Sequence, residues 1–98
     1  MSLEQFMHNT PKQKTEIEFQ TWLRIKLSIA AYAYEFKNSE IMSDAEFDKK
    51  CLQVDTSIKT TNKKLDTFFK KEFNASTGQW IHKHPELDKI KKLYKTYY

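Results

Sequence analysis

Apolar residues recur at helical spacing from residue 17 to residue 36 and predict a long helix. They fall into two neighbouring rows, which are Phe19, Leu23, Leu27, Ala30 and Tyr34, and Trp22, Ile25, Ile29, Tyr32 and Phe36. At about 100° per residue, the two rows together cover roughly 220° of the helix surface. The remaining stripe is narrow and contains Gln20, Thr21, Arg24, Ser28, Ala31 and Glu35. A helix with so wide an apolar arc packs on two sides, so we expect it at the centre of the fold.

The ends of this helix are marked by residues that favour caps and turns. Thr10 is expected as the N-cap, with Pro11 in the first turn, where its missing N–H group leaves no hydrogen bond unmade. Asn38 and Ser39 interrupt the apolar pattern and are typical turn residues. We therefore expect the first helix over residues 10–37.

A second helix is predicted over residues 43–72. The run from Ser43 to Glu46 is a capping box with an acidic first turn, which suits the helix dipole. Apolar positions then repeat at alternating spacings of four and three residues, as a seam formed by Phe47, Cys51, Val54, Ile58, Thr61, Leu65 and Phe68. Residues near 60 have poor helix propensity, so the helix is expected to bend or break there. The seam favours an antiparallel hairpin with the first helix; a homodimer through residues 47–68 is the alternative.

A short third helix is predicted over residues 85–97, with Pro85 at its first position. Residues 74–79 contain the only glycine, Gly78, and are expected to form a loop. Together these elements predict one all-α domain over residues 1–98. It is a small helical bundle built on a long two-helix antiparallel hairpin with a short C-terminal helix.

Composition excludes several classes of site. One cysteine among 98 residues rules out an internal disulfide and a zinc site of several thiolates, and Cys51 on the seam is expected to be a buried structural thiol. One glycine cannot supply a phosphate-binding loop. His82 and His84 are expected as solvated loop residues rather than metal ligands. No nucleophile–base pair is evident, so we expect a non-enzymatic protein. We also expect it to be cytoplasmic, without a membrane span, a metal or a cofactor.

The charge is unevenly distributed along the chain. The formal net charge is +4; residues 1–48 carry five bases and eight acids, whereas residues 49–98 carry twelve bases and five acids. Lysine pairs alternate with aromatic residues in the second half, an arrangement that grips nucleic acid through phosphates and stacked bases. The candidate nucleic-acid-binding residues are Lys63, Lys64, Lys70, Lys71, Lys91, Lys92, Phe69 and Tyr97.

The stretch from Tyr34 to Asp48 reads Tyr-Glu-Phe-Lys-Asn-Ser-Glu-Ile-Met-Ser-Asp-Ala-Glu-Phe-Asp. It resembles the N-terminal Ia domain of NAD-dependent DNA ligases, a small helical hairpin with a tyrosine near the end of its first helix and a Ser-Asp-Ala-Glu-Tyr-Asp start to its second. The His-Pro-Glu-Leu run at residues 84–87 resembles a second motif of that family, although it lies further downstream here.

The resemblance implies a nucleotide site. In that family these residues bind the nicotinamide mononucleotide (NMN) half of NAD, which implies NMN or NAD as a ligand of this chain. The implied binding residues are Tyr34, Asp44, Phe47 and Asp48; Phe47 stands where the family has tyrosine, and Glu35 where it usually has histidine. The chain has no Lys-x-Asp-Gly motif, so the resemblance implies a stand-alone module, as in a phage-type orphan domain, rather than a ligase.

Three functions follow as hypotheses. The first is a non-enzymatic interaction module that contacts nucleic acid, or a nucleic-acid-processing protein, through its basic C-terminal half. The second is a nucleotide-binding or NMN-binding module of the ligase Ia type. The third is a phage-type protein that acts on a protein partner by dimerisation or inhibition.

Overall fold

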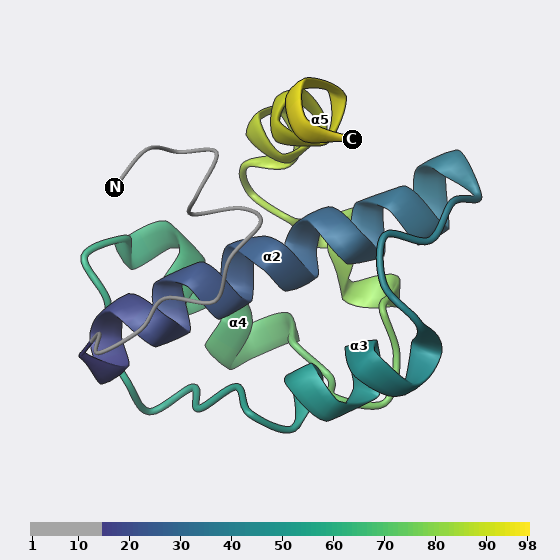
Figure 1. Cartoon of the computed structure of the whole chain (residues 1–98). Helices are drawn as coiled ribbons and strands as arrows, with labels where there is room; N and C mark the ends of the chain where they lie inside the picture. Colours follow the sequence, from purple (N-terminus) through teal and green to yellow (C-terminus); the bar gives the residue numbers. More distant parts are fainter. Residues whose placement is uncertain (1–14) are drawn as a thin grey trace.

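A computed structural model describes residues 15–98, which form an all-α fold, as the sequence predicts (Figure 1). Within this range there are four α-helices, one 3₁₀ helix and no strand. The elements are α2 (Glu16–Lys37), α3 (Asp44–Cys51), α4 (Lys63–Glu72), η1 (Gln79–Lys83) and α5 (Leu87–Tyr97). The cap predicted at Thr10 and Pro11 lies outside the described residues, but the predicted helix over residues 10–37 is wrong at its start, because Thr15 is extended and α2 begins at Glu16. None of the helices in the described range is long and apolar enough to cross a membrane.

Side-chain and backbone caps fix both ends of α2. The Thr15 hydroxyl accepts a hydrogen bond from the backbone N–H of Glu18 at 3.2 Å, which satisfies one of the unpaired donors at the helix start. At the other end Asn38 adopts the left-handed conformation, with φ 50° and ψ 42°. The N–H of Ser39 then bonds back to the Ala33 carbonyl at 3.0 Å. The predicted end at Lys37 and the turn after it are confirmed.

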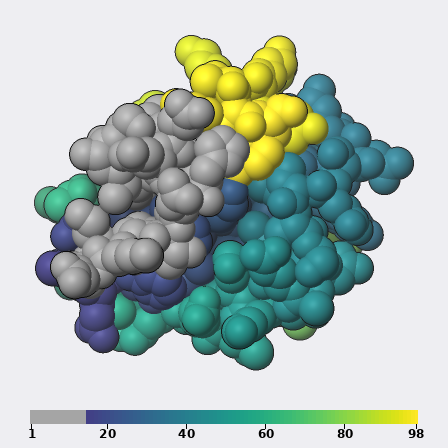
Figure 2. All heavy atoms as spheres, in the orientation of Figure 1, coloured from purple at the N-terminus to yellow at the C-terminus, as the bar shows by residue number. Residues whose placement is uncertain are grey.

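The central position predicted for α2 is also confirmed, and its burial goes further than the pattern indicates. The two apolar rows supply much of the core, and helices α3, η1 and α5 all pack against α2. Most of the stripe expected to face water is buried as well, including Gln20, Arg24, Ser28 and Ala31. In the space-filling view, the yellow atoms of α5 lie directly against the blue atoms at the C-terminal end of α2 (Figure 2).

The second helix is broken, as the poor helix propensity near residue 60 predicts, but the interruption is longer than expected. The capping box does start a helix, since the Ser43 hydroxyl accepts from the Glu46 N–H at 3.1 Å. That helix, α3, ends at Cys51, and residues 52–62 are irregular before α4 begins. The irregular segment therefore includes the residue-60 region that helix propensity indicates, but it begins about two and a half turns earlier.

Hydrogen bonds from α2 explain this early break. Gln20 donates from Nε2 to the Gln53 carbonyl at 2.9 Å, and its Oε1 accepts from the Asp55 N–H at 3.0 Å. Arg24 donates from Nη2 to the carbonyls of Asp55 at 2.8 Å and Ile58 at 2.9 Å. In a continuous helix each of these groups would pair with a backbone group four residues away. The two buried α2 side chains take the place of those helical hydrogen bonds.

Most of the seam residues face the protein's own core. Cys51, Leu65 and Phe68 are buried in the main hydrophobic cluster, with Phe47 and Val54 packed against it, whereas Thr61 is exposed. The seam is divided among α3, the irregular segment 52–62 and α4, and its helical parts pack within the chain. The homodimer through residues 47–68 stays a prediction.

The C-terminal third packs through aromatic rings. Phe69 contacts Phe73 at a centroid distance of 5.1 Å and Trp80 at 5.2 Å, and Trp80 lies on the unpredicted helix η1. Helix α5 docks on α2 with Ile90 buried and with Tyr94 5.5 Å from the Tyr32 ring.

The start predicted for the last helix is two residues early. Helix α5 begins at Leu87, and Pro85 lies in the preceding turn. There the Nδ1 atom of His84 accepts from the Glu86 N–H at 3.0 Å. The imidazole of His84 thus binds the backbone N–H of Glu86 just before α5 begins.

Candidate functional site

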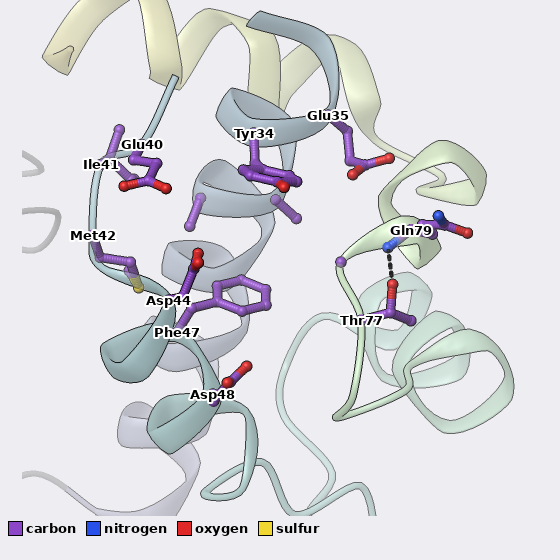
Figure 3. A pocket seen from close by; sticks show the side chains of 13 residues that line it. Tyr34, Glu35, Glu40, Ile41, Met42, Asp44, Phe47, Asp48, Thr77 and Gln79 are labelled. Atoms are coloured by element: carbon purple, nitrogen blue, oxygen red, sulfur yellow. Dashed lines mark hydrogen bonds between the residues drawn. The ribbon is translucent and has the colours of Figure 1, made fainter. Parts of the chain in front are cut away.

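A pocket of about 410 Å³ lies where three segments of the chain meet. One wall is the C-terminal part of α2, the second is the 40–48 segment with the start of α3, and the third is the 77–79 segment before η1 (Figure 3). Its volume falls in the usual range for small-molecule sites. The two α2–α3 walls are adjacent in sequence, whereas the third wall comes from about 30 residues further along the chain.

All four residues that the ligase resemblance implies line this pocket: Tyr34, Asp44, Phe47 and Asp48. Tyr34 lies one turn before the end of α2, and the other three occupy the first turns of α3. Asp44 and Asp48 are four residues apart, so they share a face of α3. In Figure 3 the Tyr34 ring lies above the opening, with Asp44, Phe47 and Asp48 below it. The Asn38 turn and the Ser43 cap set this geometry, because they fix the angle between the two helices.

The pocket is acidic and has an aromatic surface. Its lining includes the carboxylates of Glu35, Glu40, Asp44 and Asp48 and no lysine or arginine. Tyr34 and Phe47 contribute ring faces, and the Tyr34 side chain is 56% exposed at the mouth. Carboxylates and aromatic faces both attract a cation, and a planar cation also gains stacking contact. Within residues 15–98, no three acidic, histidine or cysteine side chains are grouped so that they could hold a metal ion.

Glu35 is turned away from the other carboxylates. Its Oε1 lies 2.9 Å from Nε2 of His82 on η1, and Figure 3 shows its side chain directed toward that helix. The His82 ring also packs on Phe36 at a centroid distance of 4.8 Å. This contact corrects the expectation for His82, which is bound to α2 rather than simply solvated. The same expectation is wrong for His84, because its side chain is buried rather than solvated.

The 77–79 wall is the part of the site that sequence reasoning missed. A Cβ atom built on Gly78 would lie 3.5 Å from Cβ of Ala31 and 3.6 Å from Cζ of Phe47. Gly78 therefore faces the pocket, and the absence of a side chain at this position leaves space in the cavity. The Thr77 hydroxyl accepts from the Gln79 N–H at 3.2 Å and holds this wall in a tight turn. The one available signal was that the chain places its only glycine here.

The residues predicted to bind nucleic acid do not form a single surface. Lys63, Lys64 and Lys71 line a groove on α4, with Lys83 of η1 on its other side. Lys70 is exposed outside that groove, and Lys91 and Lys92 are exposed on α5. The two predicted aromatic partners, Phe69 and Tyr97, take up different positions in the fold.

Phe69 is completely buried among Phe73 and Trp80, so the expectation that it stacks a nucleotide base is wrong. The i, i+3, i+4 spacing of its apolar neighbours explains this, since Leu65, Phe68 and Phe69 form the inner face of α4. Tyr97 is partly buried and packs on the core cluster.

Cys51 is a structural thiol, as predicted. It is 1% exposed, and burial, together with the Asp48 carboxylate, raises its pKa to about 11. A thiol with so high a pKa is protonated at neutral pH and is a poor nucleophile.

No protein-family model, no curated protein and no solved structure matches the chain. The similarity to the ligase Ia domain therefore stays a prediction that rests on residues 34–48 and 84–87 of the sequence.

Proposed function

We propose that the pocket binds a nicotinamide nucleotide in its oxidised, cationic form, and that the chain is a cytoplasmic binding module without catalysis of its own. The observation that carries this proposal is the convergence of Tyr34, Asp44, Phe47 and Asp48 on one cavity. The sequence resemblance implies these four residues without regard to whether they lie near one another, and in the structure they line the same pocket. The burial of Phe69 weakens the competing hypothesis of base stacking on the basic half.

The chemistry of the lining suits the nicotinamide ring and the ribose better than the phosphate. The oxidised ring carries a positive charge, which Tyr34 and Phe47 stabilise through their faces and Asp44 and Asp48 through their carboxylates. The same carboxylates accept hydrogen bonds from ribose hydroxyls. No basic side chain lines the pocket, so the phosphate has to project from the mouth toward water.

This arrangement predicts an order of affinity. Reduction of the ring removes its charge and with it a cation–aromatic attraction of about 1–2 kcal/mol, which corresponds to roughly a tenfold loss of affinity. Removal of the phosphate removes a repulsion. Oxidised nicotinamide riboside should therefore bind at least as tightly as NMN, and reduced nicotinamide riboside should bind least.

The test is a titration followed by amide and side-chain NMR signals, with each of the three compounds up to millimolar concentration. We expect shifts at Tyr34, Phe47 and Gly78, and their loss in an Asp44→Asn, Asp48→Asn variant. The matched control is Asp88→Asn, which removes an acid from the first turn of α5, away from the pocket. The proposal fails if none of the compounds shifts the pocket signals, or if the reduced riboside binds as well as the oxidised one.

A further inference from the structure

The groove on α4 is basic on both sides. It has a volume of about 550 Å³ and is separate from the acidic pocket, with no lining residue in common. Lys63, Thr67 and Lys71 follow one another at intervals of four residues, so they lie along one side of α4. At 1.5 Å per residue, the row from Lys63 to Lys71 extends about 12 Å. Lys64 lies beside this row, and Lys83 of η1 closes the opposite side.

Few carboxylates oppose these charges. The only acidic residue among the lining residues is Glu72, whose carboxylate lies 3.5 Å from Nζ of Lys83. The other acid of α4, Asp66, pairs with the buried guanidinium of Arg24 at 2.8 Å. The salt bridges among residues 15–98 leave Lys63 and Lys71 without a carboxylate within 4.0 Å. The groove therefore carries an excess of positive charge.

The groove floor is apolar but offers no ring to a base. Phe68 lines it, yet the Phe68 side chain is only 6% exposed and packs against Trp80 and His84. Pro85 forms the rest of the floor, and the Thr67 hydroxyl is an available hydrogen-bond donor. The exposed large hydrophobic residues of the described range, which a lipid surface would need as anchors, all lie outside the groove.

We propose that this groove binds the phosphate backbone of nucleic acid and does not read its sequence. Lys63 and Lys71 stand at the two ends of a row of about 12 Å, with the Thr67 hydroxyl between them and Lys64 and Lys83 beside it. This linear arrangement suits a series of phosphates, each of which an ammonium group recognises as a point charge. The site is narrower than the whole basic half: it comprises Lys63, Lys64, Lys71 and Lys83, with Thr67, and it excludes Lys91 and Lys92 on α5.

The experiment measures the binding of a fluorescently labelled oligothymidylate by anisotropy at several salt concentrations. With three to four phosphates neutralised, log K should fall with log salt with a slope of about −2 to −3. Changing Lys63, Lys64 and Lys71 together to Gln should weaken binding at least about tenfold at low salt and reduce the slope by about 2. All three side chains are exposed, so the fold should persist, which circular dichroism checks.

The matched control changes Lys91, Lys92 and Lys95 to Gln, which removes the same charge from the exposed face of α5. It should change affinity by less than about threefold. Equal losses in the two triple variants would overturn the proposal, because binding would then follow net charge alone. Absence of binding by the unaltered chain at low salt would also overturn it, as would equally tight binding of polyglutamate or of anionic vesicles. The Asp44→Asn variant should bind the oligonucleotide normally, so this proposal and the nicotinamide proposal fail independently.

Discussion

Replacement of Arg24 by Met should cost a large part of the stability of the domain. Arg24 is 1% exposed and donates to Oδ1 of Asp66 at 2.8 Å and to the carbonyls of Asp55 and Ile58 at 2.8 Å and 2.9 Å. Burial lowers the pKa of its guanidinium, and the neighbouring Asp66 carboxylate partly offsets that shift. The Met side chain fills similar space and removes all three hydrogen bonds.

The size of the loss follows from what is left unpaired. Breaking a buried ion pair by removing one partner costs about 3–5 kcal/mol. Here Asp66 keeps hydrogen bonds from the N–H and hydroxyl of Thr60, at 2.8 Å and 2.6 Å, so its charge is not left without donors. The carbonyls of Asp55 and Ile58 lose the donor that Arg24 supplies. We therefore expect a loss of about 3 kcal/mol, against a total of roughly 5–15 kcal/mol for a domain of this length.

Urea unfolding followed by circular dichroism measures this loss. Lys37→Met, an exposed basic residue in the last turn of the same helix, is the control and should change stability by less than about 0.5 kcal/mol. Arg24→Lys keeps one ammonium donor for Asp66 and should fall between the two. If the free energy of unfolding of Arg24→Met lies within about 1 kcal/mol of that of the unaltered chain, the hydrogen bonds from Arg24 do not hold the 52–62 loop. Our explanation of the broken helix would then be incorrect.

Two further predictions concern the pocket and pH. Gly78→Leu should abolish the NMR shifts caused by nicotinamide riboside, whereas Gly78→Ala should preserve them. A Cβ atom at residue 78 meets Ala31 and Phe47 at ordinary contact distance, so only a longer side chain fills the cavity. Equal binding by both variants would contradict this prediction. Burial lowers the pKa of His84 from 6.5 to about 4. Between those values the unfolded chain binds a proton that the folded chain does not, so stability should fall as pH falls from about 6.5 to 4. His84→Gln should flatten that slope by about one proton, measured by urea unfolding at several pH values, and an unchanged slope would show that the imidazole is not the group responsible.

The sequence predicts the elements whose signals are local. The Ser43 capping box, the turn at Asn38 and the inward direction of Cys51, Leu65 and Phe68 all rest on contacts within a few residues, and all are confirmed. A periodic pattern reports which side of a segment is apolar. It does not report whether two apolar segments that share one helical periodicity belong to a single helix.

The break is predicted near residue 60, but its start directly after Cys51 could not be predicted, because the cause is distant in sequence. Gln20 and Arg24 lie 31 to 35 residues from the backbone groups that they bind in the loop, and both fall in the narrow polar stripe of the pattern. The pocket shows the same division. The four predicted residues belong to one continuous stretch, residues 34–48, whereas Gly78 reaches the pocket only because η1 packs on α2.

The burial of α2 has a consequence for how the chain is made. This helix is synthesised before α5, which covers the surface that α2 presents to Ile90 and Tyr94. At about 5–20 residues per second, the ribosome needs roughly 3–12 s to add residues 38–98. During that interval the nascent chain exposes apolar surface that its later segments bury. A polypeptide cut before residue 87 would lack α5 and keep that surface open, so we expect it to be retained by chaperones and degraded faster than a chain that includes α5.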